Sequence, residues 1–323
     1  MSSPVSPEVA ARPLFIINPM SGGGRTRKRL GTLIDAIERA GMEPDVLFTT
    51  HQGHGTDLAA EAIADGREFL VACGGDGTVN EVANAIMAAG ANDRVRLGTI
   101  GMGTGKDIAK GLGIARGNLA VRAIAAGDDR PIDIGKVTGQ DAEGNEYVRY
   151  FLLEASAGWV PEISQSTPRW LKRLGDTAPY VVMAGVKMIG EMGRPFTLTI
   201  DGQEFDGRYN SVSVHNMELW GGDLLAAPGA APDDGLLDVI RWGDMSRRVA
   251  MKAIDGQRKG GIHLDIEGID RHPAKVVELS SPKPSQLDLD GEPGGFLPAR
   301  IEVIAGAIRF VAPPAVVPTP PAS

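Results

Sequence analysis

Short apolar runs alternate with helical patterns through the first 130 residues, and this alternation restricts the fold more than any other feature of the chain. The apolar runs are 14–18, 46–49, 69–73 and 97–100. The segments that follow them place apolar residues at helical spacing and are 30–37, 58–63, 78–89 and 108–112. Strands separated by helices of this length are joined by crossovers and lie parallel. The pattern therefore predicts a doubly wound α/β layer.

Beyond residue 130 the chain changes to short β-rich runs separated by Gly, Pro and Asp. These runs are 196–200, 212–214, 236–241, 276–279, 286–289 and 301–303. Asp201-Gly202 follows the first of them and is typical of a hairpin turn. We expect an antiparallel, β-sandwich-like domain here, interrupted by one helical segment from Trp170 to Met192.

A chain of 323 residues favours two domains over one. We assign residues 13–130 to an α/β domain and residues 131–305 to a β-rich domain. The Ser/Pro/Ala-rich start, residues 1–12, is expected to be disordered, and residues 314–323 form a Pro-rich extended tail.

Composition narrows the class of protein. The net charge of −8 argues against a sequence-independent nucleic-acid binder, and we expect no nucleic-acid partner. No apolar run approaches the roughly 18–20 residues that cross a bilayer, and the N-terminus lacks the apolar core of a signal peptide. Cys73 is the single cysteine, so no intramolecular disulfide can form, and we read it as a small buried residue. These features favour a cytoplasmic protein.

The strongest motif is Gly74-Gly75-Asp76-Gly77-Thr78, directly after an apolar run. Three glycines allow backbone N–H groups to approach a polyphosphate. Thr78 and Glu81 have the spacing of a capping box, which predicts a helix N-terminus and hence an anion site. A carboxylate at Asp76 is unusual in an anion site unless a metal or a hydroxyl group needs it. A plain strand–turn–helix with a capped start is the alternative.

Two further glycine-rich loops have the same position relative to an apolar run. They cover residues 18–24 and 101–107, and neither has the P-loop or the dinucleotide-binding pattern. Because the carboxyl ends of parallel strands meet at one edge of a sheet, we expect the three loops to converge on one ligand crevice.

Acidic residues gather near the end of the second domain. Asp288, Asp290 and Glu292 alternate along the chain, and alternate residues of a strand share a face. This face could be a solvated edge or a general-base cluster, and the spacing allows either. Asp-Gly turns occur both here and in the stretch 232–235.

Taken in this order, the motifs resemble the diacylglycerol kinase catalytic-domain family, the bacterial lipid-kinase branch that also includes sphingosine and ceramide kinases. The matching stretches are FIINPMSGGG, VACGGDGTVNEVANAIM, LGTIGMGTGKDIAKGLGI, RPIDIGKV, FLLEASAGW, the block from VHN to GGDLLAAPGAAPDDGLLDVI, and LDLDGEPGG. The resemblance spans residues 14 to about 311. It implies a nucleotide-binding α/β domain, a β-rich lipid-substrate domain, an active site in the cleft between them, and a return of residues 306–313 to the first domain.

The resemblance also implies residue roles. The residues that would contact ATP are Asn18, Pro19, Met20, Ser21, Gly22, Thr49, Gly74, Gly75, Asp76, Gly77, Thr78, Val79, Asn80 and Thr104. Glu292 stands where the family has its proton acceptor, whereas spacing alone would also allow Asp290; we take these two and Asp76 as candidate catalytic carboxylates. A magnesium ion would take Asp234 and the backbone carbonyls of Ala231 and Leu236, which fits the preference of Mg²⁺ for oxygen ligands.

One position departs from the family pattern. Lys106 stands where the family has Asn, and it could add charge beside the phosphates or point to solvent.

These observations predict an ATP-dependent lipid kinase that phosphorylates a primary hydroxyl of a membrane lipid through peripheral contact. Diacylglycerol, a sphingoid base, ceramide and phosphatidylglycerol stay open as acceptors, and so does a homodimer. Apolar residues of the segment 170–192 could line a lipid site or belong to the core. The alternatives are an NAD kinase-like enzyme, which shares the GGDGT loop, and a non-catalytic nucleotide- or lipid-binding protein.

Overall fold

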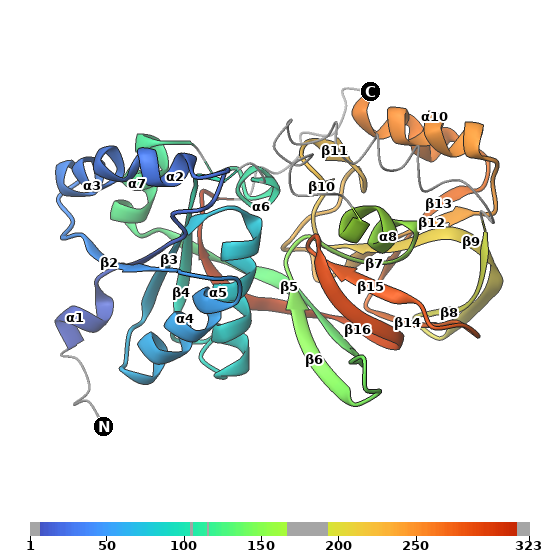
Figure 1. Ribbon diagram of the computed structural model, residues 1–323, viewed down its shortest axis with the longest axis horizontal. Helices are drawn as coiled ribbons and strands as arrows, with labels where there is room; N and C mark the ends of the chain where they lie inside the picture. Colours follow the sequence, from blue (N-terminus) through green and yellow to red (C-terminus); the bar gives the residue numbers. More distant parts are fainter. Residues whose placement is uncertain (1–6, 104–105, 115, 167–192, 315–323) are drawn as a thin grey trace.

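The computed structural model describes residues 7–103, 106–114, 116–166 and 193–314. It has an α/β domain at one end and a β-rich domain at the other, as expected from the sequence (Figure 1). Thr104 and the helical segment expected at 170–192 lie outside the described residues. Within the part of the chain that is described, no helix is both long enough and apolar enough to cross a membrane.

The first domain is built on four parallel strands in the order β4-β3-β1-β2. Their bounds are β1 Leu14–Ile17, β2 Asp45–Phe48, β3 Phe69–Gly74 and β4 Arg96–Gly101. Every residue of β1 and β3 is buried, which explains why both read as continuous apolar runs. Cys73 lies in β3 and is fully buried, so the interpretation of this residue as a small core side chain is confirmed.

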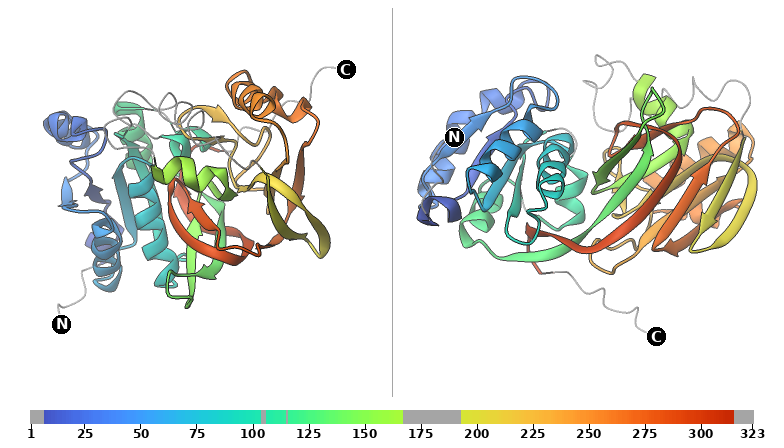
Figure 2. Two further views of the ribbon diagram at one scale, coloured as in Figure 1. Left: turned by 45° about the vertical axis from the view of Figure 1, so that its right-hand side comes forward. Right: turned by 90° about the horizontal axis from the view of Figure 1, so that it is seen from below.

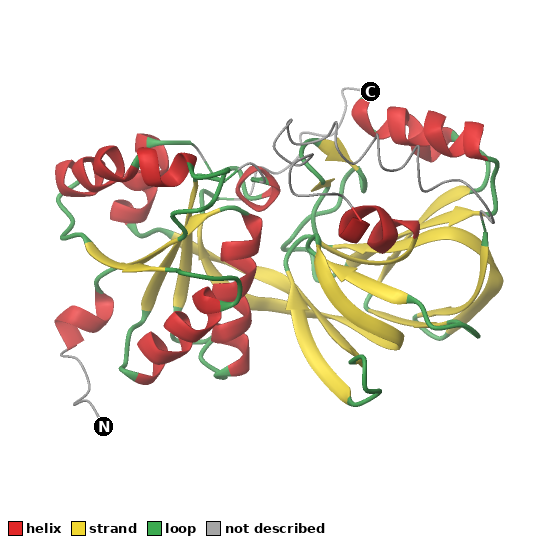
Figure 3. Cartoon of the chain, in the orientation of Figure 1, coloured by secondary structure: helices red, strands yellow, loops and turns green. Residues whose placement is uncertain are grey.

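Helices cover both faces of this sheet (Figure 3). They are α2 Arg25–Lys28, α3 Leu30–Arg39, α4 His54–Ala64, α5 Asp76–Ala88, α6 Asp107–Gly111 and α7 Asn118–Ala126. α4 packs against α5 on one face, and α3 packs against α7 on the other. The predicted doubly wound layer is therefore confirmed.

The second domain is an antiparallel, sandwich-like arrangement of strands. Their bounds are β5 Asp129–Gln140, β6 Glu146–Phe151, β7 Glu154–Gly158, β8 Arg194–Ile200, β9 Gln203–His215, β12 Leu237–Gly243, β13 Ile269–Ala274, β14 Val276–Ser280, β15 Gln286–Leu289 and β16 Glu292–Val311, with the short pair β10 Leu219–Trp220 and β11 Leu224–Leu225. The predicted hairpin at Asp201-Gly202 joins β8 to β9, and both turn residues have positive φ, 47° and 86°.

Three helical segments of the second domain were not expected from the sequence. They are α8 Trp159–Ser166, α10 Arg247–Arg258 and the 3₁₀ turn η2 Ile262–Asp265. α10 buries Ala250, Ala253, Gly256 and Gln257, and Met251 and Ile254 pack partly buried against the same cluster. The apolar residues of α10 do follow helical spacing, but this short, charge-rich segment was not predicted from the sequence.

The two domains are joined by paired strands rather than by a loop. β16 is 20 residues long and runs antiparallel to β5 over almost its whole length. Its end pairs in parallel with β4, through Arg309–Arg96 and Phe310–Leu97, so it returns to the first domain as the resemblance implies. The expected boundary at residue 130 falls inside β5, which Figure 2 shows crossing with β16 from one domain to the other.

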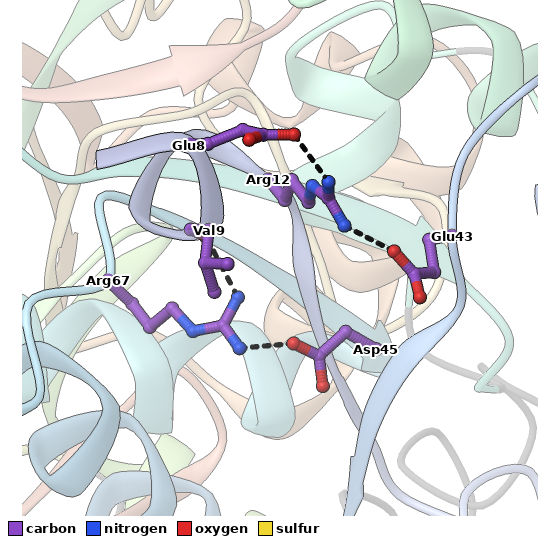
Figure 4. Close-up of polar contacts among 6 residues, drawn as sticks. All are labelled: Glu8, Val9, Arg12, Glu43, Asp45 and Arg67. Atoms are coloured by element: carbon purple, nitrogen blue, oxygen red, sulfur yellow. Dashed lines mark hydrogen bonds and ion pairs between the residues drawn. The ribbon is translucent and has the colours of Figure 1, made fainter. Parts of the chain in front are cut away.

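The N-terminal stretch differs from its expected disorder. Residues Pro7–Ala11 form the short helix α1, and Arg12 bonds to Glu8 at 2.7 Å and also to Glu43 (Figure 4). Arg67 holds the same helix by donating to the carbonyl of Val9 at 3.0 Å. These contacts place α1 against Glu43 and Arg67 of the first domain; residues 1–6 lie outside the description.

Candidate active site

The three glycine-rich loops meet, as the sequence predicted. The carbonyl of Gly74 accepts hydrogen bonds from the backbone N–H groups of Met102, at 2.8 Å, and Gly103, at 2.9 Å. A Cβ atom on Gly103 would lie 2.5 Å from Cα of Gly75, so the loops pack backbone against backbone. Only glycine allows this approach at position 103.

The first loop joins the same cluster through its asparagine. Asn18 Nδ2 donates to Oγ1 of Thr78 at 3.4 Å, and Asn18 Oδ1 accepts the N–H of Met20 at 3.0 Å. Thr49 lies at the end of the neighbouring strand, where its N–H bonds to the carbonyl of Ile17 at 2.9 Å. The candidate nucleotide-contacting residues thus lie at one edge of the sheet, where open α/β sheets bind ligands.

The predicted capping box is wrong. Helix α5 begins at Asp76, two residues before Thr78, and its N-cap residue is Gly75. The carboxylate of Glu81 does not reach back to the helix start; it accepts the N–H groups of Gly53, at 2.8 Å, and Gly55, at 2.9 Å. An exposed helix N-terminus beside Gly75 and Gly77 still provides donors for a phosphate.

Asp76 has a structural partner that the sequence did not indicate. Its two carboxylate oxygens accept the N–H groups of Asp107, at 3.1 Å, and Ile108, at 3.2 Å, and so satisfy the start of α6. Burial, together with the neighbouring Asp107, raises the pKa of Asp76 to about 7. The side chain of Asp76 therefore connects the loop at residues 74–78 to the loop at residues 101–107. With this pKa, its carboxylate changes charge near neutral pH.

Val79 and Asn80, two of the expected nucleotide contacts, have buried side chains. Val79 is buried in the core of the first domain. Asn80 is also buried, and its Nδ2 donates to Asp290 at 2.7 Å and to the carbonyl of Tyr150 at 3.1 Å. Lys106 is the N-cap residue of α6, and its aliphatic chain lies along Gly101.

Asp290 is a partly buried anchor. Its carboxylate accepts the N–H groups of Leu152, Leu153 and Glu154 at 2.8–3.0 Å, in addition to the Asn80 amide. Burial raises the pKa of Asp290, although these hydrogen bonds oppose the change. All four donors hold the carboxylate in place, so it is poorly suited to move a proton.

Glu292 lies on the other side of a tight turn. β15 ends at Leu289, and Asp290 and Gly291, with φ of 53° and 85°, form a two-residue hairpin turn to β16. Leu289 pairs with Glu292, and Asp288 pairs with Pro293. The expectation that Asp288, Asp290 and Glu292 share one strand face is therefore wrong, because the turn places Glu292 on the face opposite to Asp288.

The carboxylate of Glu292 faces the phosphate loop from the second domain. Its Oε2 accepts a hydrogen bond from Gln52 Nε2 at 2.7 Å. Its Oε1 lies 4.0 Å from the place where a Cβ on Gly77 would stand. Among the described residues no hydrogen bond is donated to Oε1, so this oxygen can accept a proton.

A cavity of about 520 Å³ opens beside this carboxylate, between the domains. Seven of the ten residues that line it have polar side chains; the lining consists of Gln52, Gly53, Thr56, Gly77, Asn80, Glu81, Asn84, Arg149, Glu292 and Pro293. Gln52, Asn84 and Arg149 were missed by sequence reasoning, because no motif marks them.

A second acidic group lies deeper in the sheet. Glu154 is 2% exposed and Asp288 is fully buried. Burial raises the pKa of Glu154 well above its usual range, and the nearby carboxylates of Asp288 and Asp290 add to the effect. The carboxylates that cluster are therefore Glu154, Asp288 and Asp290, not the alternating trio of the sequence.

The candidate magnesium ligands lie on the turn before β12. Asp133 fixes this turn, because its carboxylate accepts the N–H groups of Gly235 and Gly306, both at 2.7 Å. Asp234 Oδ1 accepts the N–H of Leu236 at 2.9 Å. Within the described residues no group of three or more His, Cys, Asp or Glu side chains could hold a metal, so a site here depends on backbone oxygens. One carboxylate and two carbonyls fit Mg²⁺ by donor type.

Comparisons with known proteins match both domains. Residues 12–137 match the family described as Diacylglycerol kinase catalytic domain, and residues 156–312 match the YegS C-terminal NAD kinase beta sandwich-like domain. A protein of Bacillus subtilis (strain 168) named diacylglycerol kinase is 33% identical over 311 residues, covering 94% of this chain and 96% of that protein. A diacylglycerol kinase of Staphylococcus aureus (strain bovine RF122 / ET3-1) is 30% identical over 304 residues, covering 94% and 92%.

Solved structures with the same fold also match this chain. One from Bacillus anthracis str. Sterne superimposes with a TM-score of 0.77 at 27% identity, covering 95% of this chain and 96% of that chain. A yeast NADH kinase complexed with NADH superimposes with a TM-score of 0.50 at 13% identity, covering 94% and 84%, and shares the fold alone. The order of domains expected from the motifs is therefore confirmed over nearly the whole chain.

Proposed function

The chain belongs to the diacylglycerol kinase family, and from this membership we propose that it is an ATP-dependent lipid kinase. In this proposal it transfers the γ-phosphoryl group of ATP to a primary hydroxyl of a membrane lipid. The lipid oxygen forms the new bond to phosphorus, the bond from phosphorus to the β–γ bridging oxygen breaks, and ADP leaves.

The nucleotide would bind at the meeting point of the three loops. The first backbone N–H groups of α5 lie there, and Gly77 leaves room beside them, because a Cβ on it would meet no atom nearer than 4.0 Å. Phosphoryl transfer needs mainly positioning and charge stabilisation, which such backbone donors supply. Asn18 and Ser21, of the loop at residues 18–24, lie beside Thr78 and Gly103 at the same edge of the sheet.

One observation carries the proposal: Glu292, from the second domain, directs Oε1 at Gly77 of the phosphate loop. A hydroxyl placed between this oxygen and the γ-phosphate would pass its proton to Glu292 as the new bond forms. Asp290 is the weaker candidate, because its carboxylate is fully engaged.

We place Mg²⁺ on Asp234 and the carbonyls of Ala231 and Leu236. The ion would supply positive charge that stabilises this turn and, through Asp133, the junction of β5 with β16.

The acceptor would reach the cleft from the membrane surface by peripheral contact. The resemblance of the fold to an NADH kinase makes NAD a competing acceptor to test.

The test is a mass-resolved assay of the protein with ATP, Mg²⁺ and a panel of acceptors. The panel holds diacylglycerol, a sphingoid base, ceramide and phosphatidylglycerol in mixed micelles, with NAD as a soluble acceptor. We expect one lipid to gain a single phosphate. Phosphorylation of NAD alone would favour the alternative enzyme, and binding of ATP without turnover of any acceptor would favour a non-catalytic protein.

A further inference from the structure

We propose that Gln52 is a positioning residue that holds Glu292 in the orientation needed to accept the substrate proton. This inference rests on the proposed function, because it takes Glu292 as the proton acceptor. It assigns a role to a residue of the first domain that no motif marks.

The contact joins two distant parts of the chain. Gln52 follows β2 in the first domain, whereas Glu292 opens β16 in the second, 240 residues later. The distance from Nε2 to Oε2 is 2.7 Å, at the short end of the range for an N–H···O hydrogen bond. The bond leaves Oε1 facing Gly77.

The loop that carries Gln52 is itself fixed. Glu81 of α5 accepts the N–H groups of Gly53 and Gly55, and its carbonyl accepts the hydroxyl of Thr56 at 3.2 Å. Gly53 has φ of 86°, a conformation that side chains other than glycine rarely adopt. The loop is therefore anchored to the same helix whose first turn forms the phosphate loop.

The other end of the contact is equally constrained. The turn residue Asp290 accepts four hydrogen bonds, and Arg149 Nη1 donates to the carbonyl of Pro293 at 2.7 Å. Backbone positions on both sides of Glu292 are thus held, and the torsions of its own side chain are what Gln52 restricts.

An amide suits this task chemically. It donates a hydrogen bond to one carboxylate oxygen but carries no charge and no proton to exchange near neutral pH. A Lys or Arg in its place would neutralise the carboxylate and weaken it as a proton acceptor. Gln52 therefore orients Glu292 without competing for the proton.

The experiment compares Gln52→Ala with the matched control His51→Ala in steady-state and single-turnover assays. His51 is the exposed neighbour on the same loop, and its ring contacts Thr50 and His54 rather than Glu292. We expect kcat of Gln52→Ala to fall about tenfold, because small misplacements of a reacting group are costly, with KM for ATP within twofold. His51→Ala should retain normal kcat. Gln52→Asn, whose donor is one methylene shorter, should behave like Gln52→Ala.

A double-mutant cycle separates positioning from a general structural role. In a Glu292→Gln background the proton acceptor is already lost, so adding Gln52→Ala should cause no further loss. Independent losses that multiply would overturn the proposal. So would an unchanged kcat in Gln52→Ala, or a raised KM for ATP with kcat unchanged, which would make Gln52 a nucleotide contact.

Different results would refute the assignment of Glu292 as proton acceptor and the positioning role of Gln52. If Glu292→Gln turns over normally, the proton acceptor has been assigned wrongly and the role of Gln52 falls with it. If Glu292→Gln is impaired while Gln52→Ala is normal, the proposed function stands and only the positioning role is overturned.

Discussion

Replacement of Glu292 by Gln tests the proton acceptor with little change in shape. Glutamine has the same length and number of heavy atoms, so the new side chain can still accept the hydrogen bond from Gln52 through its amide oxygen. Glu292 is also only partly buried and lies at a strand end, so the fold does not depend on its charge. What the variant loses is the capacity to take a proton.

The size of the effect follows from that single loss. Removal of a general base typically lowers kcat by about 10²–10⁴, which corresponds to roughly 3–5 kcal/mol of transition-state stabilisation. ATP affinity should stay within a few-fold, because the phosphate donors belong to the first domain. The melting temperature should stay close to that of the parent.

The assay is single-turnover phosphoryl transfer to the lipid that the acceptor panel identifies, with ATP affinity measured by calorimetry. Asp290→Asn is the comparison, since it replaces one carboxylate oxygen, the acceptor of two of these hydrogen bonds, with an NH₂ donor and should mainly lower the melting temperature. Near-normal turnover in Glu292→Gln, together with a folded but inactive Asp290→Asn, would refute the assignment and make Asp290 the acceptor.

Three further predictions concern neighbouring parts of the site. Gly77→Ala should keep or raise the melting temperature, because its Cβ meets no atom nearer than 4.0 Å and alanine favours a helix, yet weaken ATP binding by about tenfold; equal affinity would contradict the phosphate-loop assignment. Asp234→Ala should lower the melting temperature in Mg²⁺-containing buffer only, whereas an equal drop with EDTA would indicate a plain turn residue. Relative to the parent, Glu154→Gln should stabilise the fold increasingly as pH rises above the ordinary range of a glutamate: burial raises the pKa of Glu154 in the folded state, so the folded parent keeps this proton while the unfolded chain ionises, and the parent loses stability. A difference in melting temperature that does not change with pH would contradict this last reasoning.

The first domain and its loops were predictable because each rests on a local signal. Buried parallel strands read as apolar runs, and glycines directly after them mark the edge where ligands bind. The parallel order then forces the loops together, which the bonds from Met102 and Gly103 to Gly74 bear out. No pairing between distant residues had to be known.

The predicted capping box and the predicted shared face of Asp288, Asp290 and Glu292 were wrong for a different reason: both depend on the backbone conformation, which residue spacing does not show. Thr78 and Glu81 have the right spacing, but Gly75 in an extended conformation lets α5 begin at Asp76. Glu81 is then one turn too far along to bond the helix start, and it bonds the loop before α4 instead. Spacing shows that a cap can form, and only the surrounding backbone decides whether it does.

The contact between Gln52 and Glu292 lay beyond sequence reasoning, because it depends on how the two domains are placed. That placement comes from β16, which carries Glu292 at its start and pairs with β4 of the first domain at its end. Asp133 of β5 stabilises this placement further, because its carboxylate accepts the N–H groups of Gly306 in β16 and of Gly235 in the turn before β12. At roughly 3.3 Å per residue, a strand of this length can cross a whole domain, so backbone pairing at one end fixes the carboxylate at the other. Changes that loosen the pairing of β16 with β4 should therefore reduce turnover although they lie far from the phosphate loop.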